Sequence, residues 1–127
     1  MNLNQICVSL ELAKELKEAG YKQDSLFWWN FYSPGAMDEE LVRTAYGRYK
    51  LENIGQDSEE SIAAPTASEL LEQLPKDIAF YHWRWESGQY NFGFENGNGG
   101  EENFGEDTLV DAIAKCWLYT IKRAGTW

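Results

Sequence analysis

The stretch Ile78 to Phe94, IAFYHWRWESGQYNFGF, decides the fold of this chain. Its first arm, up to Glu86, and its second arm, from Gln89, both alternate with a period of two, which is typical of β-strands. Ser87-Gly88 between the arms is a turn signal. The pattern therefore predicts an antiparallel hairpin.

The register of this hairpin depends on the length of its loop. With two or four loop residues, six of the seven large aromatic side chains of the arms share one face, with Phe80 on the other, and cross-strand pairs of this kind contribute about 0.2 to 1 kcal/mol each. An odd loop would break the match, so we expect an even one and interpret the six rings as core. The expected pairs are Trp85 with Tyr90, Trp83 with Phe92, and Tyr81 with Phe94.

Amphipathic segments flank the hairpin on both sides. Ser9 is a good N-cap and Gly20 a good C-terminal cap for a first helix. Thr66 and Glu69 form a capping box ahead of a second helix, and a broad apolar face after Thr108 predicts a third. The predicted helices cover residues 10–19, 67–74 and 109–123.

The remaining segments give weaker signals. Leu26 to Tyr32 has the aromatic composition of a strand, and between Met37 and Ile62 we lean towards a strand at Leu41 to Leu51. Glu95 to Asp107 is rich in Gly, Asn and Glu, which indicates a long exposed loop with a short strand near Phe104.

The whole chain is predicted to form one α+β domain, residues 1–127. It has 127 residues, of which 43% are hydrophobic and 15% aromatic, enough for one well-packed core. We expect an antiparallel sheet, with the aromatic hairpin at about 78–94 in its centre, packed by the three helices.

Charge and cysteine usage exclude several classes of protein. The net charge of −10 disfavours ordinary nucleic-acid binding. Cys7 and Cys116 lack metal-site spacing and are interpreted as free thiols in a reducing compartment. The longest apolar run is Leu26 to Trp29, and no basic residue precedes Lys14, so we expect neither membrane insertion nor a secretion signal. The predicted location is the cytoplasm.

Three blocks of sequence occur here in a distinctive order. They are CVSLELAKELKEAGYKQDSLFWW at Cys7 to Trp29, APTASELLEQLP at Ala64 to Pro75, and EDTLVDAIAKCWLY at Glu106 to Tyr119, with an aromatic strand pair between the last two. As a set they resemble a family of small uncharacterised proteins encoded in tailed-phage and prophage genomes. The resemblance implies a helix-flanked antiparallel sheet and a phage-related origin. It implies no activity, cofactor or catalytic residue.

Two motifs invite a reading as reactive or metal-binding sites. His82 is the only histidine, so a Cys-His nucleophile would have to combine it with Cys7 or Cys116, but nothing nearby in sequence activates a thiolate. The acidic segment from Glu95 has a Gly and a Glu at EF-hand positions, yet Gly97 and Gly99 stand where side-chain ligands are required. We expect no metal and no cofactor.

One basic segment, RTAYGRYK at Arg43 to Lys50, combines Arg43 and Arg48 with tyrosines that can stack on bases. Against a net charge of −10, nucleic-acid contact there is disfavoured, and an edge strand kept soluble by its charges is the preferred interpretation.

The sequence favours a non-enzymatic, phage-related accessory protein that binds another protein or itself through an aromatic surface or sheet face. A first alternative is an acidic decoy that mimics DNA and blocks a nucleic-acid-binding protein. A second is a small enzyme with a site near His82. The candidate functional surface comprises His82, Arg84, Arg43, Arg48, Glu101 and Glu102.

Overall fold

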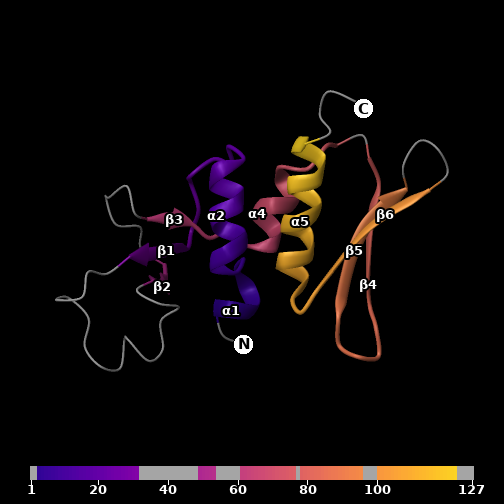
Figure 1. The fold of residues 1–127 in the computed structure, drawn as a ribbon, viewed down its shortest axis with the longest axis horizontal. Coiled ribbons are helices and arrows are strands. Elements are labelled where there is room, and N and C mark those ends of the chain that lie inside the picture. Colours follow the sequence, from indigo (N-terminus) through magenta and orange to yellow (C-terminus); the bar gives the residue numbers. More distant parts are fainter. Residues whose placement is uncertain (1–2, 32–48, 54–60, 77, 96–99, 123–127) are drawn as a thin grey trace. The chain divides into compact units, whose positions relative to one another are not determined.

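The computed structural model describes residues 3–31, 49–53, 61–76, 78–95 and 100–122 (Figure 1). Contacts within the chain group it into two compact units, Met1–Thr66 and Ala67–Trp127. Each unit contains one three-stranded antiparallel sheet and helices, which confirms the α+β class. The proposal that residues 1–127 form one domain stays a prediction.

The first unit holds a small sheet in the order β2-β1-β3. The predicted strand at 26–32 is present as β1, and Ile62–Ala63 adds a short strand that the sequence did not indicate. The segment 41–51 lies mostly outside the described residues, and only its end belongs to β2. The elements are α1 (Leu3–Ile6), α2 (Leu10–Glu18), β1 (Trp28–Phe31), β2 (Tyr49–Glu52) and β3 (Ile62–Ala63).

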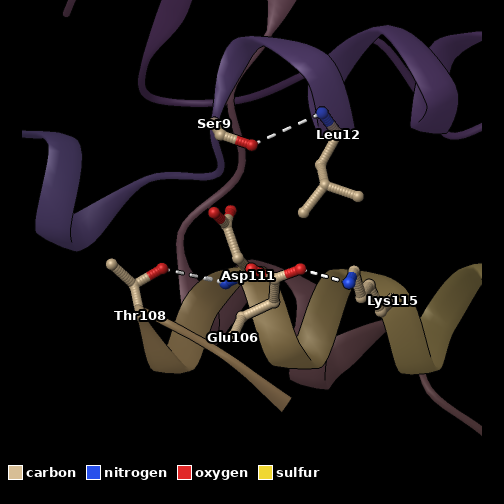
Figure 2. Close-up of polar contacts among 6 residues, drawn as sticks. All are labelled: Ser9, Leu12, Glu106, Thr108, Asp111 and Lys115. Atoms are coloured by element: carbon tan, nitrogen blue, oxygen red, sulfur yellow. Dashed lines mark hydrogen bonds and ion pairs between the residues drawn. The ribbon is translucent and has the colours of Figure 1, made fainter. Parts of the chain in front are cut away.

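Helix α2 confirms the helix predicted at 10–19, because both of its predicted caps are formed. Ser9 Oγ accepts a hydrogen bond from the Leu12 backbone N–H at 3.5 Å (Figure 2). At the other end Gly20 has φ +95°, and its N–H donates to the carbonyl of Lys17. The next N–H, of Tyr21, reaches back to the preceding turn, which completes a Schellman motif.

The core of the first unit is fixed by buried polar contacts as well as apolar packing. Trp29 is 2% exposed, and its indole N–H donates to the Val8 carbonyl at 3.0 Å. Beside it, the buried Asn30 accepts from Ser61 Oγ at 3.0 Å and donates to Glu52 at 3.0 Å. The buried polar groups of Trp29, Asn30 and Ser61 therefore all have hydrogen-bond partners.

The second unit contains the hairpin, extended to three strands in the order β4-β5-β6. The helices predicted at 67–74 and 109–123 are confirmed as α4 and α5. Thr108 Oγ1 accepts from the Asp111 N–H at 3.3 Å and so caps α5 (Figure 2). The elements are α4 (Ala67–Glu72), β4 (Phe80–Arg84), β5 (Tyr90–Glu95), β6 (Glu101–Glu106) and α5 (Leu109–Lys122).

The loop predicted at 95–107 is wrong for residues 101–106, which form strand β6. Every residue of β5 pairs with one of β6, from Tyr90 with Glu106 to Glu95 with Glu101. The short strand expected near Phe104 is therefore present and longer than expected. Its Phe104 ring lies 5.4 Å from the Tyr119 ring of α5, so one apolar contact anchors a strand of otherwise polar composition.

The predicted hairpin register is wrong by one residue. Arg84 lies opposite Tyr90 and Trp83 opposite Asn91, so the loop holds three residues, Glu86 to Gly88. Gly88 donates its N–H to the Trp85 carbonyl at 2.8 Å and has φ +95°. A type I turn followed by a left-handed glycine is a common three-residue hairpin loop, and this geometry overrides aromatic pairing.

The corrected register distributes the side chains over two faces of the sheet. Helix α5 covers one of them, which we call the proximal face, through the contacts of Phe94 and Phe104 with Tyr119 (Figure 1). We call the opposite one the distal face. The proximal face carries Phe80, His82, Arg84, Tyr90, Phe92, Phe94, Glu102, Phe104 and Glu106, and the distal face carries Tyr81, Trp83, Trp85, Gln89, Asn91, Gly93, Glu95, Glu101, Asn103 and Gly105.

The six paired aromatics are therefore not one core cluster. Phe92 and Phe94 are buried at 3% and 0% exposure, and Phe80 stacks on Phe92 at 5.4 Å. Tyr81 and Trp83, expected beside them, lie on the other side of the sheet. The core of the second unit is thus made by β5 and α5, together with α4, whose Leu70 is fully buried, while β6 contributes the partly exposed Phe104.

Candidate functional site

The first four candidate residues fall into two groups. His82 and Arg84 are exposed side chains of β4 on the proximal face. Arg84 is engaged within the sheet, since its guanidinium carbon lies 5.1 Å from the Tyr90 ring centroid, in cation–π range. Arg43 and Arg48, and the nucleic-acid contact considered for them, lie outside the described residues.

The two acidic candidates lie on the far edge of the same sheet. Glu101 and Glu102 begin β6, which is separated from β4 by β5. Glu102 shares the proximal face with His82, whereas Glu101 projects from the distal face. The structure therefore does not gather His82, Arg84 and the two glutamates into one site.

Instead, the distal face presents a row of aromatic side chains along β4. The Tyr81 and Trp83 rings are stacked, with centroids 5.4 Å apart and planes at 23°. Trp85 continues the row with its ring edge-on to Trp83, at 6.3 Å and 83°. Trp85 is also 54% exposed, which is high for a side chain of this size.

Next to this row, β5 contributes small and amide side chains. Asn91 lies directly across from Trp83 and Gly93 across from Tyr81. Asn91 is 6% exposed, and its Nδ2 has no hydrogen-bond partner in the described part of the chain. A buried amide donor without an acceptor is uncommon and costs about 1 to 3 kcal/mol, so it calls for a physical explanation.

Gly93 has a steric role in the centre of this face. A Cβ at this position would collide with the backbone oxygen of Glu102 and lie 2.8 Å from the Cα of Asn103. Strands β5 and β6 therefore approach here more closely than any side chain permits. Gly93 is therefore a buried position without a side chain, directly opposite Tyr81.

That acidic end consists of Glu95 and Glu101, which are directly opposed on β5 and β6. Like charges in this position repel one another. Burial raises the pKa of the Tyr81 phenol, and the negative charges of Glu101 and Glu95 raise this pKa further. An aromatic row, a buried amide and a carboxylate pair thus share one face.

The geometry argues against the reactive sites considered from the sequence. Burial raises the pKa of the Cys116 thiol to about 12, which keeps it protonated and poorly nucleophilic at neutral pH. Cys7 is fully buried in the first unit. Within the described ranges, no three His, Cys, Asp or Glu side chains come together as a metal site would require.

The acidic residues of β6 do not form one charged row. Glu101 projects from the distal face, whereas Glu102 and Glu106 project from the proximal face, where Glu106 forms an ion pair with Lys115 of α5 (Figure 2). The other acidic clusters considered for a decoy, residues 38–40 and 57–60, lie outside the described residues. Among the described residues of the acidic segment 95–107, the carboxylates therefore lack phosphate-like spacing on one surface.

The sequence reasoning missed Tyr81, Trp83 and Asn91 as surface candidates because it placed β4 in the wrong register. Two local signals pointed to the correct arrangement. Gly88 at the third loop position suits a left-handed turn residue, and Gly93 inside a strand marks close backbone approach.

Comparison of the chain with protein-family models, with curated proteins and with solved structures found no match. The resemblance to phage and prophage proteins therefore stays a prediction. Among the helices that the structure describes, none is both long and apolar enough to cross a membrane.

Proposed function

We propose that this protein is a non-enzymatic binding module that recognises another protein through the distal face of its β4-β5-β6 sheet. The phage-related accessory role implied by the block order belongs to the same proposal. So does a cytoplasmic location, which two buried free thiols, Cys7 and Cys116, support.

The observation that carries the proposal is the row of Tyr81, Trp83 and Trp85 on the side of the sheet turned away from α5. Tyrosine and tryptophan are the residues that most often dominate the energy of protein interfaces, because they offer large rigid area at small entropic cost. Trp85 packs edge-on against Trp83 yet is 54% exposed, so a large part of its ring is open to a partner.

Trp85→Ala tests the proposal, since an exposed side chain can be removed with little effect on folding. Immobilised wild-type protein should retain a partner from its native host that Trp85→Ala loses at least about tenfold. Leu26→Ala is the matched control, because Leu26 is an exposed apolar residue, at 70%, in the other unit. Retention of every partner by Trp85→Ala would contradict the proposal.

Self-association through the same face needs its own measurement. Sedimentation equilibrium of wild type over a hundredfold concentration range should show a rise in mass if a second copy is the partner. Trp85→Ala should then remain monomeric. A constant monomer mass in both proteins assigns the face to a different protein.

A further inference from the structure

We infer that the partner reaches the distal face with an extended basic segment, whose lysine or arginine head lies between the Tyr81 ring and the carboxylates of Glu95 and Glu101. This inference rests on the proposed function and adds the chemistry of the partner. Three independent features of the face support it: a like-charge pair, an adjacent aromatic surface, and a buried amide without an acceptor.

The like-charge pair is the first step. Glu95 and Glu101 are both exposed and occupy directly opposed positions, where Cβ atoms lie roughly 4.5 to 5.5 Å apart. Within the described segments, no lysine or arginine forms an ion pair with either of them. A cation placed between the two carboxylates would remove their repulsion and gain two attractive contacts.

The aromatic surface beside the pair makes the site selective for a cation on a carbon stem. Tyr81 lies opposite Gly93, two residues before Glu95 on the neighbouring strand, so its ring is diagonal to the acidic pair, and Trp83 stacks on that ring. Basic side chains bind such ring faces well. The chain itself uses this contact elsewhere, with Lys14 Nζ 5.0 Å from the Tyr49 ring centroid.

The buried amide supplies the direction of the peptide. Asn91 Nδ2 is a donor that lacks an acceptor in the described residues, and because it is covered in the free protein, a backbone carbonyl of the peptide reaches it only when the side chains over it move aside. Asn91 and Glu95 are four residues apart on β5, which corresponds to about 13 Å. A segment of about four extended residues therefore spans the amide and the acidic pair.

Other partner chemistries satisfy fewer of these features. An acidic or phosphorylated segment, or a nucleic acid, would be repelled by Glu95, Glu101 and the net charge of −10. A neutral oligosaccharide can stack on the aromatic row but leaves the repulsion between the carboxylates in place. A basic peptide is the chemistry that uses all three.

The test is an NMR titration of the full chain with three blocked peptides, Ac-GGRGG-NH2, Ac-GGQGG-NH2 and Ac-GGEGG-NH2. Only the arginine peptide should give saturable shifts, at the indole N–H of Trp83 and the backbone amides of Gly93, Glu95 and Glu101. Equal shifts with the glutamine peptide, or the same shifts with a neutral oligosaccharide such as maltohexaose, would overturn the inference.

Charge variants separate a local site from general attraction. Glu95→Gln/Glu101→Gln should weaken binding of the arginine peptide about fivefold, the effect of losing two exposed ion contacts. Glu11→Gln/Glu15→Gln removes the same charge from exposed positions on α2 and should leave binding unchanged. If both variants lost the same affinity for the arginine peptide, net charge alone would explain the binding and the inference would be overturned.

The outcome also distinguishes this inference from the proposed function. If Trp85→Ala abolishes capture of a partner while the arginine peptide fails to bind, the binding face stands and its basic ligand is wrong. If the peptide binds at the predicted residues but Trp85→Ala loses no partner, the cation site stands and the proposed function fails. The glutamine double variant should melt no lower than wild type, which shows that a loss of binding is not a loss of folding.

Discussion

Trp83 lies directly across from Asn91 on the neighbouring strand, so the stacked indole and the buried amide share the distal face. A large aromatic ring, that of Trp83, thus lies beside the Asn91 amide, whose Nδ2 has no hydrogen-bond acceptor among the described residues. An unmade hydrogen bond of this kind costs stability in the folded protein.

Asn91→Leu should therefore make the free protein more stable. Leucine has a similar volume and removes the unpartnered donor, so the free energy of unfolding should rise by about 1 kcal/mol, measured by urea denaturation. Binding of the arginine peptide should weaken in the same variant. A variant that is destabilised, with binding unchanged, would show that the amide is satisfied in solution by water.

Gly88→Ala should destabilise the second unit by about 1 to 2 kcal/mol, because alanine is strained at a φ of +95°. Ser87→Ala in the same loop is the control and should change the free energy of unfolding by less than about 0.5 kcal/mol. Equal stability of Gly88→Ala and wild type in urea would mean that the loop does not hold the left-handed conformation.

Gly93→Ala should be the more damaging of two glycine substitutions on the distal face. Its Cβ would meet the backbone of Glu102 and Asn103, which can yield only if β5 and β6 separate. We expect a loss of about 2 to 3 kcal/mol and large shifts of the β6 amides in NMR spectra. The Cβ of Gly105→Ala would instead meet the flexible Gln89 side chain at 3.0 Å, so this matched variant should lose less.

The burial of Cys116 should make the folded protein less stable at alkaline pH. Burial raises the pKa of its thiol from 9.0 to about 12 in the folded chain. The thiol therefore makes its full contribution to the free energy of unfolding below pH 9, and this contribution is lost as the pH rises towards 12. Urea denaturation at pH 7 to 11 should show this fall, and Cys116→Val should flatten part of it. A stability profile that is flat to pH 11 in wild type would contradict the burial of a protonated Cys116 thiol.

The helices could be predicted because their signals are local. Ser9 and Gly20 cap α2 by contacts within one turn, and Thr108 does the same for α5. Such contacts depend on neighbouring residues alone, so composition and spacing reveal them.

The strands could not be predicted in the same way, because their pairing depends on residues far apart in the sequence. The segment 101–106 has the composition of a loop, and it becomes β6 because β5 offers it a full set of pairing partners. In the hairpin, aromatic matching favoured one register and loop geometry another, and the loop prevailed. Since that choice also decides which face Tyr81 and Trp83 occupy, the candidate site was missed together with the register.

The loop from Glu86 to Gly88 gives this chain an unusual sensitivity to changes in length. Deleting or inserting a single codon there would exchange the two faces of β4 relative to β5, because side chains alternate along a strand. The stacked Tyr81 and Trp83 would turn towards α5 and Phe80 away from it. Natural variants should accordingly tolerate many substitutions at Glu86 and Ser87 while preserving the loop length and Gly88, and a deep mutational scan that includes single-residue deletions would reveal the contrast.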